Sequence, residues 1–187
     1  MRVIAGVAKG RRLKGPPARS RREVAAVTRP SSDLVRGAMF SALSSMGADM
    51  SRVLDLYAGS GALGIEALSR GGGSCDFVER DAQACAIIRE NLRLTGFEAQ
   101  ARVHCLSAER ALERLDGPFT LVLADPPYAD GEAIRMLATF AESRLLEAGQ
   151  AVIVLEHGAR DEPSAELGPF SLHSARRHGD SAVSIYR

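Results

Sequence analysis

The sequence predicts an α/β protein with a doubly wound, mostly parallel sheet, a C-terminal antiparallel hairpin and a small basic hairpin extension at the N-terminus. Three observations predict this fold. Short apolar runs alternate with segments of helical periodicity from residue 52 to residue 156, as in a parallel sheet covered by helices on both faces. The first apolar run enters a glycine-rich turn that opens a helix. Residues 170–187 contain two strand-like runs around Gly179-Asp180.

The N-terminal residues 1–30 are expected to be an extension of a main domain that spans residues 31–187. Residues 2–7 and 11–15 are predicted strands of a short hairpin, because turns are indicated at Gly6 and Gly10. Residues 15–30 are rich in Pro, Ser and Arg and are expected to form a loop. Residues 31–45 carry apolar side chains at helical spacing, with a Ser or Asp available as N-cap, so a helix is predicted there.

In the rest of the main domain, predicted strands and helices alternate regularly. Asp81 stands where an N-cap is needed and Gly96 where a helix should end, so the second helix of this series has both of its boundary signals. The predicted strands are 52–58, 74–79, 101–105, 119–124 and 150–156, and the predicted helices are 61–72, 81–96, 107–115 and 132–146.

Composition narrows the class of protein. The chain has 187 residues, of which 45% are hydrophobic and 25% charged, as in an ordinary globular protein with one domain. No apolar stretch approaches the roughly 18 residues that span a membrane. The three cysteines are odd in number and widely spaced, and the four histidines lack ligand spacing, so neither disulfides nor a metal are expected. We expect a cytoplasmic monomer.

The net charge of +1 conceals an asymmetry. Residues 1–36 contain ten Lys/Arg and two acids, which gives +8, whereas the rest contains 14 basic and 21 acidic residues, which gives −7. A cationic segment on a mildly acidic body indicates a surface for a polyanion such as RNA. A charge run alone is also compatible with a solvated tail that binds nothing.

A glycine motif follows the first predicted strand of the main domain. Gly59, Gly61 and Gly64 have the spacing G-x-G-x-x-G, and Glu79 lies 20 residues after Gly59 at the end of the next strand. A carboxylate at that place can accept both hydrogen bonds from a ribose diol, so a nucleoside ligand is predicted. The loop suits either a dinucleotide or S-adenosylmethionine. Asp55 could pair with the ammonium group of the latter, or could cap the amides of the loop itself.

A second motif, Asp125-Pro126-Pro127-Tyr128, follows the predicted strand 119–124. Strand ends at this edge of an open α/β sheet are where ligands bind. The two prolines hold an extended backbone, so a carboxylate, a carbonyl and an aromatic ring stand beside one another. The first two groups only accept hydrogen bonds, and the ring can stack. These properties suit a planar group with an NH₂, such as the exocyclic amine of a nucleobase, and orientation would supply most of the catalysis.

These motifs, together with the upstream "GRRLKGPP" and "TRPSSDLVRGAMFSAL", resemble the bacterial 16S ribosomal RNA guanine-N2 methyltransferases from about residue 2 to residue 157. The resemblance implies a seven-stranded, Rossmann-like sheet and S-adenosylmethionine as cofactor. It also implies, as substrate, the N2 amine of a guanine in 16S ribosomal RNA, within the small subunit or its assembly intermediate. Two positions depart from the family pattern. Ser107 stands near the place of an acid that contacts adenine, and Gly37 stands where the family tends to have an acid.

Carried over by position, the resemblance implies three groups of site residues. The cofactor would contact Asp55, Tyr57, Gly59, Ser60, Gly61, Glu79, Arg80 and Ser107. The target base would be held by Asp125, Pro126, Pro127 and Tyr128. RNA would be bound by Arg2, Lys9, Arg11, Arg12, Lys14 and Arg29, the last beside Pro30 in the "TRP" segment.

Other functions remain open at this point. Adenine N6 or another amine could be the acceptor, because amine methyltransferases share the "PPY" element, although the basic segment favours nucleic acid over protein. A nicotinamide-dependent oxidoreductase would explain the glycines and Glu79 but not residues 125–128. A non-catalytic RNA-binding assembly factor would use the basic segment alone.

Overall fold

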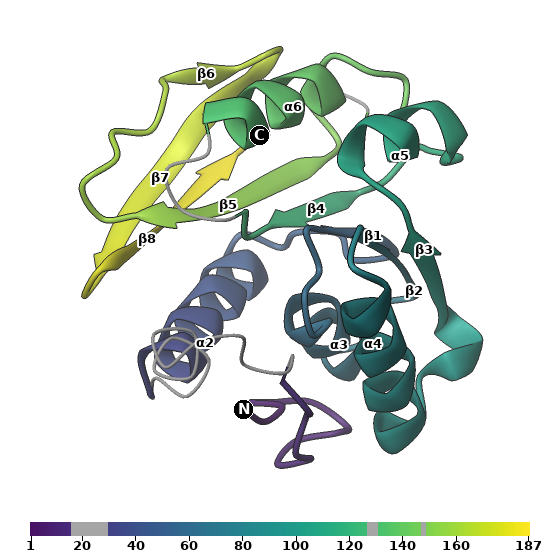
Figure 1. Cartoon of the computed structure of the whole chain (residues 1–187). Coiled ribbons are helices and arrows are strands. Elements are labelled where there is room, and N and C mark those ends of the chain that lie inside the picture. The colour runs from purple at the N-terminus through teal and green to yellow at the C-terminus, as the bar shows by residue number, and fades with distance from the viewer. Residues whose placement is uncertain (16–29, 127–130, 147–148) are drawn as a thin grey trace.

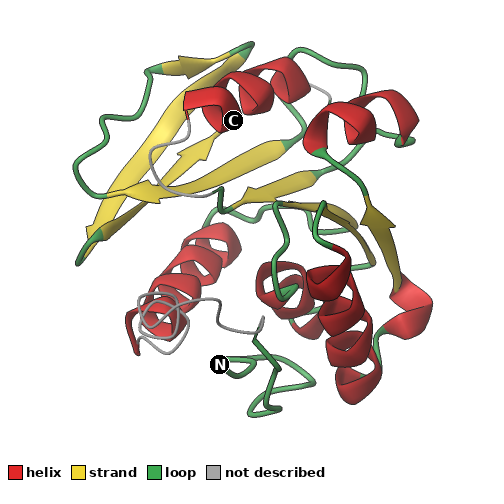
Figure 2. Cartoon of the chain, in the orientation of Figure 1, coloured by secondary structure: helices red, strands yellow, loops and turns green. Residues whose placement is uncertain are grey.

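The computed structural model describes residues 1–15, 30–126, 131–146 and 149–187. One mixed sheet crosses the molecule in the order β3-β2-β1-β4-β5-β8-β7-β6 (Figures 1 and 2). Strands β3 to β5 are parallel, and β8, β7 and β6 continue the sheet antiparallel. The predicted fold class is confirmed. The strands are β1 (Arg52–Leu56), β2 (Ser74–Glu79), β3 (Ala101–Cys105), β4 (Leu121–Ala124), β5 (Val152–Gly158), β6 (Glu166–Leu167), β7 (Phe170–His178) and β8 (Ser181–Tyr186).

Helices cover both faces of the sheet (Figure 1). One face packs against α2 (Pro30–Ser45), α3 (Ala62–Ser69) and α4 (Ala82–Thr95), and the other against α5 (Ala108–Arg114) and α6 (Gly131–Ala141). A short 3₁₀ turn, η1 (Glu98–Gln100), precedes β3. Each face therefore has its own apolar core, and the nearly continuous apolar runs of β1 and β4 reflect burial on both sides. None of the helices described is both long and apolar enough to cross a membrane.

Local signals mark the ends of α4 as expected. The Asp81 side chain accepts hydrogen bonds from the backbone N–H groups of Gln83 and Ala84, 2.8 and 3.0 Å away. Gly96 ends the helix with a φ of 81°, in the left-handed region that glycine adopts at little cost. Both predicted caps are confirmed.

Two elements differ from the prediction. The sheet has an eighth strand, because the two residues of β6 pair with the start of β7 at the edge. Helix α6 ends at Ala141, although the periodicity predicts a helix to residue 146. The Ser143 hydroxyl donates to the Phe140 carbonyl and accepts from the Leu145 N–H, so local side-chain bonds replace the next helical turn.

The predicted N-terminal hairpin is present, but its two arms are too irregular to be assigned as strands. The arms are joined by backbone hydrogen bonds such as that from the Val3 N–H to the Arg11 carbonyl at 3.0 Å, and by one isolated antiparallel bridge. The backbone N–H groups of Ile4 and Ala5 donate to the two carboxylate oxygens of Glu66 in α3, at 2.8 and 3.0 Å. The backbone hydrogen bonds of this segment are thus shared between the hairpin itself and the main domain.

The same segment contributes to the core and is not a free tail. Val3, Ala8 and Leu13 are buried with the residues of α2, α3 and α4. Ser69 donates its hydroxyl to the Ala5 carbonyl and accepts from the Ala8 N–H. The proposed boundary at residue 30 stays a prediction, because residues 16–29 lie outside the described part of the chain.

Candidate active site at the carboxyl ends of the strands

Neighbouring strand ends bring the central predicted residues to one edge of the sheet. Glu79 is the last residue of β2, whereas Tyr57 and Asp125 directly follow β1 and β4. Because β1 lies between β2 and β4, these three residues follow one another across the sheet. The spacing of adjacent strands places the Glu79 and Asp125 backbones about 10 Å apart. This separation suits an extended ligand that lies across the end of β1.

Two carboxylates hold the glycine loop in place. Asp55 Oδ2 accepts the backbone N–H of Gly64 at 2.8 Å, and Glu79 Oε2 accepts that of Gly59 at 2.9 Å. The other Glu79 oxygen accepts the N–H of Asp81 at 2.9 Å. A carboxylate has about four acceptor positions, so Glu79 retains capacity for two ribose hydroxyls. For Asp55, the alternative role as a cap of loop amides is the one present in the structure.

The first two glycines of the motif differ in what surrounds them. Gly59 and Gly61 have φ values of 55° and 77°, which favour glycine. A Cβ on Gly61 would lie 3.2 Å from Ile88 and 3.3 Å from Phe77, so the space beside Gly61 belongs to the core. A Cβ on Gly59 would meet only the Tyr57 carbonyl, at 4.0 Å. A ligand could therefore approach the backbone closely at Gly59 but not at Gly61.

Asp55 lies in an unusual electrostatic environment. Its side chain is buried at the end of β1, and burial raises the pKa of Asp55 to about 8. The hydrogen bond from Gly64 lowers this pKa in part, and the Glu79 carboxylate raises it further. At neutral pH the Asp55 carboxyl is therefore largely protonated until a cation approaches it. A nearby ammonium group would favour the ionised form.

Tyr57 has the only positive φ among the non-glycine residues described, at 64°. An aromatic residue in the left-handed region costs about 1–3 kcal/mol, and such strain persists where the surroundings hold it. The following residue, Ala58, donates its N–H to the Val78 carbonyl at 3.0 Å, so the turn is anchored to β2. The strained residue stands between Glu79 and Asp125, at the centre of the candidate site.

The N-terminal segment is tied to the glycine loop by one buried amide. Asn91 in α4 donates from Nδ2 to the carbonyls of Ser60 and Lys14, both at 2.9 Å. Its Oδ1 accepts the Lys14 N–H at 2.8 Å. Ser60 is itself buried, and its hydroxyl lies 3.5 Å from the Met1 sulfur. The basic segment thus begins and ends beside the predicted cofactor loop.

Ser107 and Arg80 lie beyond the ends of β3 and β2. Ser107 is the N-cap residue of α5, and its hydroxyl hydrogen-bonds Glu109 and thereby lowers the pKa of that carboxyl. Arg80 is exposed and contributes to the same shift by its charge. Glu109 thus supplies an ionised acid beside Ser107.

Asp125 lies near two other acids. Asp125 follows the pair Ala124–Leu155 by one residue, which places it opposite Glu156 of β5. The side chain is open to solvent on one side, yet protein surrounds most of it. This partial loss of hydration, together with the carboxylates of Glu156 and Asp55, raises the pKa of Asp125 above its ordinary value. Pro126 is buried, and Pro127 and Tyr128 lie outside the described residues.

The predicted RNA-binding cations divide into two groups. Three make intramolecular contacts: Arg2 with Asp33 at 3.7 Å, Arg11 with the Leu94 carbonyl at 3.0 Å, and Lys14 with Glu90 at 2.6 Å. Lys9 and Arg12 are exposed, and their side chains have no polar partner among residues 1–15, 30–126, 131–146 and 149–187. Arg29 lies outside that part.

Several residues of the site were not predicted from the sequence. Glu156 and Glu109 add charge near Asp125 and Ser107, and Asn91 and Glu66 dock the N-terminal segment. For Glu66 and Asn91 the sequence held one signal, since each is a polar residue on the apolar face of a helix. Both side chains are fully buried, and buried polar groups are normally hydrogen-bonded. No group of three or more His, Cys, Asp or Glu side chains in the described ranges is arranged to hold a metal ion.

Comparison with known proteins gives a consistent set of relatives. The family model described as "Conserved hypothetical protein 95" matches residues 1–187. A Bacillus subtilis protein named "Putative rRNA methyltransferase YlbH" is 36% identical over 190 aligned positions, covering 100% of this chain and 98% of that protein. "Ribosomal RNA small subunit methyltransferase D" of Escherichia coli K12 is 31% identical, covering 100% of this chain and 89% of that protein.

A solved structure has the same architecture. The structure described as "Putative methyltransferase yhhF from Escherichia coli" superposes with a TM-score of 0.79 at 31% sequence identity. The match covers 100% of this chain and 96% of the other. The similarity therefore includes the N-terminal segment as well as the sheet.

Proposed function

The chain belongs to the family described as Conserved hypothetical protein 95, and we propose that it uses S-adenosylmethionine to methylate the exocyclic N2 amine of a guanine in small-subunit ribosomal RNA. Two full-length relatives carry names of ribosomal RNA methyltransferases, which supports this reaction class. The observation that carries the proposal is the order Glu79, Tyr57, Asp125 across three adjacent strand ends. A nucleoside held at Glu79 would extend toward an acceptor held at Asp125.

Three residues at the strand ends and in the glycine loop would hold the cofactor. Glu79 would accept the ribose hydroxyls with its remaining acceptor positions, and the open side of Gly59 would admit the ligand to the backbone. Asp55 would pair with the ammonium group by releasing its proton, while keeping its bond to Gly64. When bound, S-adenosylmethionine supplies a methyl group on a sulfonium for transfer to an amine.

The target amine would be oriented by acceptors that cannot donate. The ionised Asp125 carboxylate and the Pro126 carbonyl would each accept one N–H of the guanine N2 amine. The nitrogen lone pair would then be directed at the methyl carbon, and Tyr128 would stack on the base. Because Asp125 must be ionised to act only as an acceptor, its raised pKa predicts that activity falls on acidification at a higher pH than an ordinary Asp would cause.

The basic segment would supply affinity rather than base selection. Lys9 and Arg12 are free of intramolecular partners within the described residues and can contact phosphates. Selection of one guanine would depend on a base that is unstacked and brought to Asp125.

The test is to identify the methylated nucleoside. The purified protein is incubated with S-adenosylmethionine and with unmodified small-subunit RNA, either naked or in particles, and the RNA is digested and analysed by mass spectrometry. We expect N2-methylguanosine. N6-methyladenosine would favour the adenine alternative, and no methylation with tight nicotinamide binding would favour an oxidoreductase.

Cofactor-loop variants separate catalysis from RNA binding alone. Gly59→Arg should abolish methylation, because a long side chain would enter the open side of the loop, while RNA binding persists. An assembly factor without catalytic activity would instead keep its whole function in this variant.

A further inference from the structure

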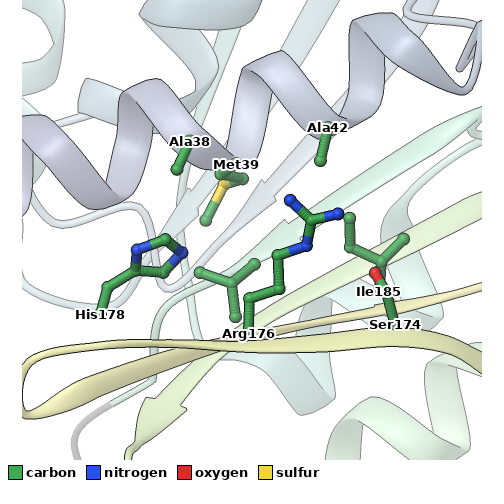
Figure 3. A pocket seen from close by; sticks show the side chains of 8 residues that line it. Ala38, Met39, Ala42, Ser174, Arg176, His178 and Ile185 are labelled. Atoms are coloured by element: carbon green, nitrogen blue, oxygen red, sulfur yellow. The ribbon is translucent and has the colours of Figure 1, made fainter.

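A groove between α2 and β7 carries an arginine and a histidine that none of the site assignments above include (Figure 3). Arg176 and His178 project from β7 toward α2, where the facing side chains are Ala38, Met39 and Ala42. Arg176 is exposed and His178 is half-buried. Neither side chain forms a hydrogen bond or an ion pair with any residue in the described part of the chain. Both side chains are therefore available to an external partner.

The groove lies on the same face of the sheet as Asp125. Arg176 pairs with Val183 of β8, and Val183 pairs with Glu156 of β5, which stands beside Asp125. Paired residues on neighbouring strands project to the same face, so this row runs from the strand end that carries Asp125 to Arg176. Three strand spacings separate the ends of the row, or about 14 Å. A few nucleotides of RNA span such a distance.

The groove is small for a ligand pocket. Its empty volume is about 220 Å³ including open solvent, below the roughly 300–1,000 Å³ of small-molecule sites. The partner must lie along the surface and contact the guanidinium and imidazole at the mouth. An RNA backbone suits this surface, because the Arg176 guanidinium can donate two parallel hydrogen bonds to a phosphate. The apolar side chains of α2 lie beside that guanidinium.

We propose that Arg176 and His178 bind backbone phosphates of the RNA segment next to the target nucleotide, as a second contact beyond the N-terminal basic segment. This inference rests on the proposed RNA substrate. Helix α2 would then have RNA contacts on two sides, with residues 1–15 against α3 and α4 and the groove against β7 (Figure 1). Two separated contacts would fix the direction in which the RNA strand crosses Asp125.

The chain offers a matched control for this proposal. Arg177 is the next residue of β7. It is also exposed, and its side chain has no polar partner within the described residues. Neighbouring residues of a strand point to opposite faces, so Arg177 projects away from α2 and from the face of Asp125. Arg176→Gln and Arg177→Gln change the net charge equally and differ only in the face that loses a cation.

The experiment measures binding of in-vitro transcribed small-subunit RNA to the full chain at several salt concentrations. Arg176→Gln should weaken binding about threefold to tenfold and reduce the salt slope by about one, with S-adenosylmethionine affinity unchanged. Arg177→Gln should stay within about twofold of the parent protein. His178→Gln should weaken binding in the same direction as Arg176→Gln.

Four outcomes would overturn the proposal. Equal losses in the two arginine variants would mean that only net charge matters. A loss seen with assembled particles but not with RNA alone would assign the groove to a protein partner. Absence of RNA binding and methylation by the parent protein would overturn the proposed function as well, whereas an active parent with unaffected Arg176→Gln would overturn this inference alone.

Discussion

At the scale of single residues, the charge state of Asp55 links the fold to the cofactor. The pKa of Asp55 is about 8 in the folded chain, because burial disfavours the carboxylate, and about 3.8 in the unfolded chain. Between these values the folded protein holds a proton that the unfolded protein has lost. The free energy of unfolding therefore decreases as the pH rises from about 4 to about 8.

Replacement of this residue should remove that pH dependence. Asp55→Asn keeps an acceptor for the Gly64 N–H but cannot ionise, so it should be more stable than the parent protein at pH 8, by on the order of a few kcal/mol. At pH 5 the difference should be small. Urea denaturation without cofactor at both pH values measures this, with exposed Asp116→Asn as the control. A variant that is equally destabilised at both pH values would argue against a protonated Asp55.

At the scale of elements, glycines at two helices illustrate opposite constraints. Gly64 lies in α3 against β2, where an added Cβ would stand 2.4 Å from Phe77 and 2.6 Å from Cys75. Gly37 lies in α2, where an added Cβ would meet only Ile4, at 3.8 Å. The first position is closed by packing, whereas the second has ordinary helical geometry and room for a methyl group.

The two alanine substitutions should therefore have opposite signs. Gly64→Ala should destabilise the fold by about 1–3 kcal/mol through overpacking. Gly37→Ala should stabilise it by about 0.5–1 kcal/mol, because alanine loses less backbone entropy in a helix. Denaturant midpoints of the two variants, measured side by side, check this. Similar midpoints would show that α3 can move away from β2 at little cost.

How far the sequence predicted these elements depended on how local their causes were. Asp81 and Gly96 mark the two ends of α4 through contacts with residues at most four positions away. Such local signals can be recognised in the sequence alone. Glu66 and Asn91 bind backbone groups of the N-terminal segment that lie 61 to 77 residues away, so local sequence signals do not identify these partners. The N-terminal hairpin was predicted, but its irregular arms were not, since the N–H groups of Ile4 and Ala5 donate to the distant Glu66 side chain rather than across the hairpin. Of the site, the strand-end residues were predicted and the added acid Glu156 was not.

At the scale of the whole molecule, the basic segment and the main domain are joined by buried polar contacts. Glu66 is fully buried and contacts Arg70 at 2.8 Å and Arg36 at 3.6 Å, besides the two N-terminal amides. Asn91 connects Lys14 to the glycine loop. The segment expected to bind RNA is therefore held beside the loop expected to bind the cofactor.

Loss of the Glu66 charge should weaken the contact between the N-terminal segment and α3. Glu66→Gln would leave Arg36 and Arg70 beside a neutral amide in a buried site, which should cost about 3 kcal/mol or more. Glu90→Gln removes an acid that also contacts the segment, through exposed Lys14, and should cost less than about 1 kcal/mol. Urea denaturation gives the two free energies, and hydrogen exchange at Ile4 and Ala5 reports the docking. Unchanged exchange in Glu66→Gln would contradict the assigned role.

The most direct test of the central claim is the rate of methyl transfer to small-subunit RNA by Asp125→Ala, measured together with the dissociation constant for S-adenosylmethionine. We expect kcat to fall by about 100-fold or more, because one acceptor of the amine is lost, while cofactor affinity stays within about threefold and Asp116→Ala behaves as the parent protein. Full activity of Asp125→Ala on the RNA that the parent protein methylates would contradict the account.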